Sequence, residues 1–292
     1  TSCLASLAGM LCQFRQYGSS SFCDSWEWKL DPYSVYDRHQ PVDLYTENAD
    51  VAIDEETALY EQQDGFFLRR ISRTKEGGTL WQYLRKKNLN VLLSYHVSAD
   101  WKRITLLKDH SSSCGQMAFE YLAHLLTACM LAHGLLTFHG VLMEYEGNGI
   151  IISAASGTGK TTHVRLWRDL RRALIIHGDR AVCAKTAEGW TGYGLPWSGT
   201  SGEQINRSVT IRALVVLRRG ETNEAHRISA LEAFHQVFAH VLYPSWDKAL
   251  AEKMMDLLES FLRDVPIFLL SCRPDAESVD VLHAALDEVL HE

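Results

Sequence analysis

Hydrophobic and polar residues follow one pattern over the first 112 residues of the chain and another pattern after them. In the first part, short runs rich in aromatic and β-branched residues lie between Gly, Asp and Asn, for example at 25–33, 65–74 and 90–109. Runs of this kind, bounded by turn-forming residues, are typical of β-strands. The sequence therefore predicts a β-rich N-terminal domain over residues 1–112.

A long apolar run follows at residues 118–136. It is almost long enough to cross a bilayer, but it contains Glu120, His124 and His133. Burial of such side chains in lipid is expensive. The run therefore predicts a buried core helix and not a membrane span.

Strand and helix patterns interleave over the rest of the chain. Two apolar segments flank "EGNG" at 146–149, which predicts a β-hairpin. Interleaved strands and helices indicate an α/β domain, which we place at residues 113–292. Helical spacing is found at 163–173, 229–242, 245–264 and 277–291, and strand patterns at 174–185, 189–197, 210–220 and 266–272.

The composition narrows the function classes. A formal net charge of −7 argues against general affinity for nucleic acid, which needs surplus Lys and Arg. The seven cysteines include no C-x-x-C pair, so reduced thiols in the cytoplasm are the simpler interpretation. The apolar residues 1–14 have no basic stretch ahead of them, and we treat them as part of the fold. We expect a cytoplasmic protein that binds neither nucleic acid nor membrane.

The strongest chemical signal is "SAASGTGKTT" at residues 153–162. Gly157 and Gly159 allow backbone N–H groups to converge on an anion. Lys160 supplies a charge for the β- and γ-phosphates of a nucleotide, and the hydroxyl of Thr161 is placed to bind Mg²⁺. The alternative is a Gly- and Thr-rich helix start without a ligand. The predicted nucleotide-binding residues are Ser156, Gly157, Thr158, Gly159, Lys160, Thr161 and Thr162.

Phosphoryl transfer also needs a carboxylate near the γ-phosphate. Asp179 follows the apolar run 173–177, and a strand there would deliver it to the edge of the sheet that carries the loop. Its alternative role is that of a turn residue. His139, between Phe138 and Gly140, is on composition alone a packing or capping residue.

Segments 138–163 and 175–182 together resemble the catalytic core of the HPr serine kinase/phosphorylase family. The ATP-dependent phosphoenolpyruvate carboxykinases share that family's nucleotide-binding fold, and the resemblance covers about residues 115–285. It implies a mixed-sheet P-loop kinase core. It also implies that Lys160 and Thr161 bind phosphates and metal, that Asp179 is a catalytic base or metal ligand, and that His139 lies beside the transferred phosphate.

The general build is most similar to the small HPr-kinase-like proteins that modify peptides, some of which phosphorylate a serine of a ribosomal peptide. We therefore expect a kinase that uses ATP and Mg²⁺ and transfers the γ-phosphate to a serine-like hydroxyl of a peptide, protein or small molecule. The expected catalytic residues are Asp179, His139 and Lys160, and the expected metal ligands are Thr161 and Asp179.

Three questions stay open at this stage. The enzymatic alternative is carboxykinase chemistry, and the non-enzymatic one is a nucleotide-binding regulator, because Gly178 stands where the family has a second acid. Segment 192–206 either shapes the acceptor pocket or is a plain surface loop. The N-terminal domain either presents the acceptor or serves as a structural platform or homo-oligomer contact.

Overall fold

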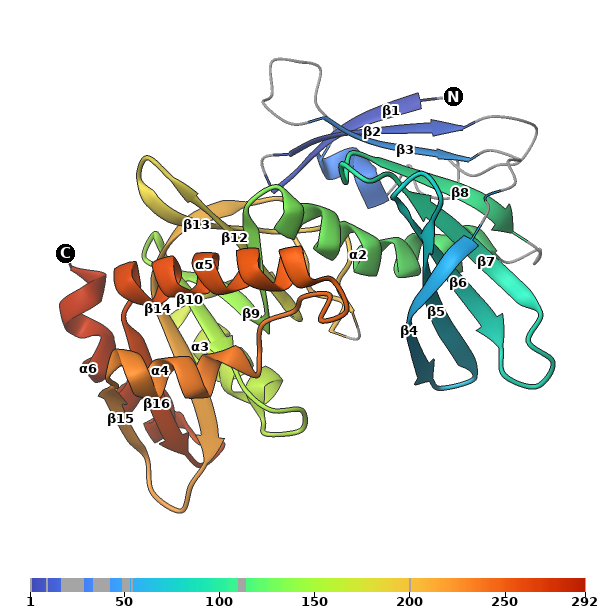
Figure 1. The fold of residues 1–292 in the computed structure, drawn as a ribbon. Helices are drawn as coiled ribbons and strands as arrows, with labels where there is room; N and C mark the ends of the chain where they lie inside the picture. The colour runs from blue at the N-terminus through green and yellow to red at the C-terminus, as the bar shows by residue number, and fades with distance from the viewer. Residues whose placement is uncertain are drawn as a thin grey trace. The chain divides into compact units, whose positions relative to one another are not determined.

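A computed structural model describes residues 2–8, 10–16, 29–33, 43–48, 53, 55–109, 114–199 and 201–291. The chain forms two compact units, Thr1–His133 and Gly134–Glu292 (Figure 1). The division falls at the end of the long apolar helix, whereas the sequence pattern predicts a second domain that begins before that helix, at residue 113. Each unit is described by itself.

The first unit is β-rich in its described residues, as the sequence predicts. Its eight-stranded sheet has the order β1-β2-β3-β8-β7-β6-β5-β4. The pairs β2–β3 and β3–β8 are parallel, and the other neighbours are antiparallel. The strands are β1 (Ser2–Leu7), β2 (Met10–Gln16), β3 (Asp43–Asn48), β4 (Glu55–Asp64), β5 (Phe67–Thr74), β6 (Thr79–Arg85), β7 (Val91–Val97) and β8 (Arg103–Asp109).

One strand-like pattern is wrong in its described part. Asp31–Tyr33 form a 3-10 helix, η1, where the sequence suggests a strand. Pro32 accounts for this, because its ring fixes φ near the helical value and removes a ladder donor. Residues 25–28 of the same pattern lie outside the described residues.

The apolar run forms the buried helix α2 (Cys114–Ala132), as predicted. Phe119 and Leu122 are buried, and the hydroxyl of Tyr95 on β7 donates a hydrogen bond to the carbonyl of Ala118. Glu120 stays exposed and forms an ion pair at 2.8 Å with Lys29. None of the helices in the described residues combines the length and the apolar character needed to cross a membrane.

The second unit contains a mixed sheet with helices packed on it. Its strand order is β10-β9-β12-β13-β14-β16-β15, with β11 beside β9. Because β10 also pairs with β14, the pairings from β10 through β9, β12, β13 and β14 form a closed circuit. The strands are β9 (Leu135–Tyr145), β10 (Asn148–Ser153), β11 (Leu174–His177), β12 (Arg180–Thr186), β13 (Gly189–Tyr193), β14 (Ser208–Arg219), β15 (Glu224–Arg227) and β16 (Ile267–Cys272).

Helices pack on this sheet through alternate residues of its strands. Val215 and Leu217 of β14 belong to one buried cluster with Val164 and Leu282, which lie on α3 and α6. Successive side chains of a strand point to opposite faces, so Val216 belongs to the other face. The predicted helices are all present, as α3 (Lys160–Arg171), α4 (Ala230–Phe238), α5 (Lys248–Asp264) and α6 (Ala276–Leu290).

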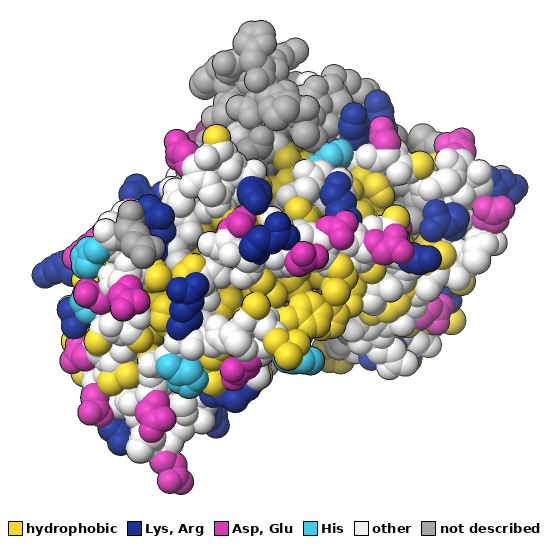
Figure 2. Space-filling view, turned by 60° about the vertical axis from the view of Figure 1, so that its left-hand side comes forward, with side chains coloured by type: hydrophobic (Ala, Val, Ile, Leu, Met, Phe, Trp, Pro, Cys, Tyr) yellow, Lys and Arg dark blue, Asp and Glu magenta, His cyan; other side chains and the backbone are white. Residues whose placement is uncertain are grey.

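Charges of both signs are mixed on the surface that Figure 2 draws, where Lys and Arg side chains alternate with Asp and Glu. Among the cysteines whose side chains are described, Cys12, Cys129, Cys183 and Cys272 are buried free thiols.

Candidate functional site

The predicted phosphate loop connects β10 to α3 in the second unit. The hairpin before it is confirmed: β9 and β10 are antiparallel and are joined at Glu146 and Gly147, with φ of 50° and 79°. Positive φ at both central residues is the mark of a tight hairpin turn. β10 also runs parallel to β14, so the carboxyl ends of both strands lie at one edge of the sheet, where open α/β sheets bind ligands.

The loop backbone has the conformation that an anion site requires. Gly157 and Gly159 have φ of 75° and 111°, values that favour glycine. Gly159 caps α3, and no side chain makes a capping hydrogen bond there. The first N–H groups and the positive end of the α3 dipole therefore suit a negatively charged ligand. Of the predicted ligands, Ser156, Gly157 and Thr162 are exposed, and Thr158, Gly159, Lys160 and Thr161 are half-buried.

Strand pairing brings His139 and Asp179 together beside this loop. Arg180, at the start of β12, is the register partner of His139 on β9. Nδ1 of His139 lies 3.8 Å from Oδ1 of Asp179, and the Asp179 carbonyl accepts a hydrogen bond of 3.0 Å from the Gly140 N–H. The backbone that carries the carboxylate is therefore fixed to the strand that carries the histidine.

Lys160 lies within electrostatic reach of both residues. Burial lowers the pKa of the Lys160 ammonium, and the negative charge of Asp179 opposes that shift. Burial is also the largest cause that lowers the pKa of His139; the charges of Lys160 and Arg180 lower it further, and Asp179 raises it. The site therefore contains a cation, an anion and a histidine whose neutral form is favoured.

His177 holds the backbone of Asp179 in place and was missed by the sequence analysis. Its Nδ1 accepts hydrogen bonds from the N–H groups of Asp179 (3.3 Å) and Arg180 (3.0 Å), and its Nε2 therefore donates to the carbonyl of Trp197. Burial lowers the pKa of His177 to about 4, so the ring stays neutral. The only sequence signal for this role is a histidine at the end of an apolar run.

Part of segment 192–206 lies against the carboxylate. Gly199 has φ of 57°, and a Cβ added to it would lie 2.8 Å from Oδ2 of Asp179. A Cβ added to Gly178 would lie 2.1 Å from Oγ of Ser201. The side chain of Ser201 therefore takes the space that a second acid at position 178 would need. Of the two roles left open for this segment, the geometry favours shaping of the site.

A cavity of about 350 Å³ opens on the β14 side of the loop. The Arg219 guanidinium donates hydrogen bonds to the carbonyls of Gly157 and Thr158. Burial and the charges of Lys160 and His139 lower the pKa of His240. Neither Arg219 nor His240 was predicted, because their approach to the loop depends on tertiary contacts. The cavity is lined by Ala155, Thr158, Val216, Leu217, Arg218, Arg219, Gln236 and His240.

The donor set is sparse for a metal. In the described parts of the chain, no group of three or more His, Cys, Asp and Glu side chains could hold an ion. The predicted ligands are one hydroxyl, Thr161, and one carboxylate, Asp179, both on half-buried residues. This set fits Mg²⁺ bound together with a nucleotide, because that ion takes one or two carboxylates plus phosphate oxygens and waters.

Comparisons with known proteins give a limited result. No protein-family model matches the sequence, and no curated protein matches it. Among solved structures, the chain is similar to the HPr(Ser) kinase/phosphatase from Coxiella burnetii, with 9% sequence identity and a TM-score of 0.34. The match covers 53% of this chain and 99% of that one. A likeness at this TM-score carries no argument about function, so any functional conclusion depends on the site itself.

Proposed function

We propose that the chain is an ATP-dependent kinase of the HPr kinase and phosphoenolpyruvate carboxykinase type. Its acceptor would be a serine-like hydroxyl of a peptide, protein or small molecule, such as a ribosomal peptide. The observation that carries the proposal is the position of Lys160, His139 and Asp179 beside a glycine loop that leads into α3. The sequence motifs at 153–162 and 175–182 support it independently.

Each residue has a role in this proposal. The loop N–H groups and Lys160 bind the β- and γ-phosphates and stabilise charge on the transferring group. Asp179 orients the acceptor hydroxyl and takes its proton while the hydroxyl oxygen bonds to the γ-phosphorus and the bond to the β-phosphate oxygen breaks. His139, with its neutral form favoured, can hydrogen-bond to the transferring group or the acceptor. Thr161 and Asp179 would hold Mg²⁺, which neutralises phosphate charge.

The runner-up is a nucleotide-binding regulator that does not transfer the phosphate. The observation that favours it is Gly178, where Ser201 leaves no space for a second acid. In a kinase, Asp179 must then serve both as metal ligand and as base. A regulator needs only the loop and Lys160.

The decisive experiment combines binding and transfer. Calorimetry with Mg·ATP tests the nucleotide site, and mass spectrometry of peptides and metabolites incubated with protein and Mg·ATP tests transfer. If the protein is a kinase, it binds Mg·ATP and an acceptor gains one phosphoryl group. Both the binding and the transfer should be lost or reduced when Lys160 is replaced. Binding without transfer identifies the regulator, and absence of binding contradicts both functions.

We further propose that residues 1–112 bind the acceptor. Once mass spectrometry has identified the acceptor, cross-linking it to the protein would test this proposal.

A further inference from the structure

Arg219 fixes the orientation of two peptide groups in the phosphate loop. Its guanidinium donates to the carbonyls of Gly157 and Thr158, the latter at 3.4 Å. In a trans peptide the carbonyl and the following N–H point in opposite directions. The bond to the Thr158 carbonyl therefore directs the N–H of Gly159 away from Arg219. Arg219 is the last residue of β14, where its register partner is Cys272 on β16, and the β14–β15 turn follows it directly.

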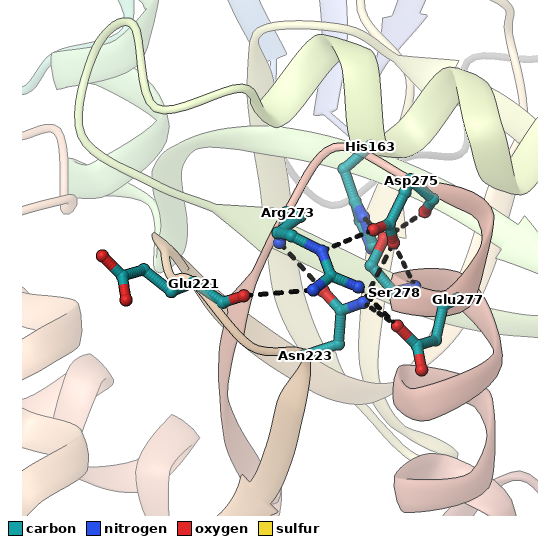
Figure 3. A network of polar contacts seen from close by, with 7 residues as sticks. All are labelled: His163, Glu221, Asn223, Arg273, Asp275, Glu277 and Ser278. Carbon is teal, nitrogen blue, oxygen red and sulfur yellow. Dashed lines mark hydrogen bonds and ion pairs between the residues drawn. The ribbon is translucent and has the colours of Figure 1, made fainter.

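A set of polar contacts holds this turn against the N-terminus of α6 (Figure 3). The side-chain carbonyl of Asn223 accepts a hydrogen bond of 2.9 Å from the N–H of Arg273. Its NH₂ group donates to Asp275 (2.9 Å) and to Glu277 (2.8 Å). The Arg273 guanidinium also donates to the carbonyl of Glu221, at 3.1 Å. Asn223 thus uses both its acceptor and its donors to join the β14–β15 turn to α6.

The same contacts continue to the helix that follows the loop. Asp275 caps α6 by accepting from the N–H of Ser278 at 3.1 Å, and the hydroxyl of Ser278 donates to the Asp275 carbonyl at 2.6 Å. Because that hydrogen is used, the Ser278 oxygen accepts from Nδ1 of His163, at 3.2 Å. Trp167 donates to the other ring nitrogen of His163 at 3.1 Å. His163 is buried in the first turn of α3, three positions after Lys160.

We propose that Asn223 is a positioning residue for the phosphate loop. Through the β14–β15 turn it keeps Arg219 on the loop carbonyls, and through Asp275 and Ser278 it is linked to His163 at the start of α3. The loop is thereby held at Gly157 and Thr158 and at the start of α3 before a ligand arrives. The expected effect of Asn223 on nucleotide affinity rests on the proposed function. Its expected effect on the conformation of the ligand-free loop does not. A preorganised loop loses less conformational entropy on binding, which is how this device would raise affinity.

Hydrogen exchange of the full chain without nucleotide tests the proposal directly. In Asn223→Ala, the amides of Thr158 and His163, which donate to the carbonyls of Ala155 and Gly159 in the free loop, should exchange about fivefold faster, because each hydrogen bond that holds the turn contributes modestly to local stability. Amides of β10 and β16 should keep their protection, since a general loss of stability would raise their exchange as well. Thr222→Ala is the matched control, because Thr222 lies in the same turn and its hydroxyl donates to Glu224 at the start of β15, at 3.1 Å, and not to α6.

A second variant keeps the test open if Asn223→Ala fails to fold. Arg219→Lys keeps the charge but lacks the planar fork that reaches two carbonyls, so it should speed loop exchange in the same way. Unchanged loop exchange in folded Asn223→Ala or in Arg219→Lys would overturn the proposal. With Mg·ATP, Asn223→Ala should raise KM and leave kcat nearly unchanged. If the wild type binds no nucleotide, the proposed function is wrong. Hydrogen exchange of the free protein still decides whether Asn223 positions the loop.

Discussion

His139 Nδ1 lies 3.8 Å from Asp179 Oδ1, and the second oxygen of the same carboxylate lies 3.8 Å from Nε of Arg180. The charge of Asp179 also acts on Lys160, whose pKa it raises against the effect of burial. A single carboxylate therefore acts on His139, Arg180 and Lys160 together. Replacing it with an amide should change the protonation of its neighbours as well as the chemistry of the site.

The first prediction concerns the protonation of His139. Asp179 is the one influence that raises its pKa, while burial, Lys160 and Arg180 lower it. In Asp179→Asn the pKa of His139 should therefore fall below its wild-type value, as measured by NMR titration of the ring resonances. Asp169→Asn, which removes an exposed acid from α3, should leave that titration unchanged. A rise in the Asp179→Asn variant would contradict the electrostatic arrangement described here.

The second prediction separates binding from transfer. If Asp179 takes the acceptor proton, Asp179→Asn should lower kcat about 10²-fold or more, the usual contribution of a positioned base. Nucleotide affinity, measured by calorimetry, should change far less because the loop and Lys160 remain. Normal turnover in this variant would defeat the assignment of Asp179.

The third prediction tests Lys160. Lys160→Met keeps most of the side-chain volume and removes the ammonium, so affinity for Mg·ATP should fall about tenfold or more through loss of a charge-assisted contact to phosphate. Lys185→Met is the control, because that exposed lysine on β12 pairs with Asp264 at 2.8 Å and not with the loop. Equal affinities of wild type and Lys160→Met would argue against a phosphate site at this loop.

The loop and its hairpin could be predicted because local chemistry determines them. The positive φ of Gly147, Gly157 and Gly159 follows from glycine, which favours such conformations, whereas Glu146 takes a φ of 50° that its residue type does not favour. The pairing of His139 with Asp179 is different, since it depends on the register of β9 against β12. Only the family resemblance, and no local pattern, indicated that the two would meet.

Other features could not be predicted from local patterns. β15 pairs with the edge of β16, and its residues Glu224–Arg227 are mostly exposed and show no apolar alternation. Arg219 and Asn223 look like ordinary surface residues of a strand end and a turn. Their contacts with the phosphate loop and with α6 depend on packing between elements far apart in sequence.

The fourth prediction concerns acid sensitivity. Burial lowers the pKa of His163 to about 4 from its ordinary value of 6.5. Between these values the unfolded chain binds more protons than the folded one, so stability rises with pH in this window and is lost as the pH falls. When the pH is lowered from about 6.5 to about 5, protonation of this residue in the unfolded chain should reduce the free energy of unfolding by about 2 kcal/mol.

Urea unfolding of His163→Gln checks the fourth prediction. The glutamine amide can still accept from Trp167 and donate to Ser278, but it does not titrate. Between about pH 6.5 and about pH 5, His163→Gln should therefore lose about 2 kcal/mol less unfolding free energy than the wild type. His226→Gln, at an exposed position on β15, should behave like the wild type. His177, whose pKa burial also lowers to about 4, keeps part of the acid sensitivity in every variant.

The fifth prediction uses two glycines of one segment. Gly199 and Gly202 have φ of 57° and 70°, so alanine at either position is strained by about 1 kcal/mol. Only at Gly199 would the new Cβ meet Asp179, at 2.8 Å from Oδ2, whereas nothing lies within 4 Å of a Cβ at Gly202. Gly199→Ala must therefore displace the carboxylate or its own backbone.

If Asp179 acts in transfer, this displacement should lower kcat about tenfold, because small misplacements of a reacting group are costly. Gly202→Ala should lose similar stability in thermal unfolding and keep its kcat. Since the two variants share the backbone strain, a difference between their rates reports on the contact with Asp179 and not on the stability of the segment. Equal rates in folded Gly199→Ala and Gly202→Ala would mean that the position of this carboxylate does not limit the reaction.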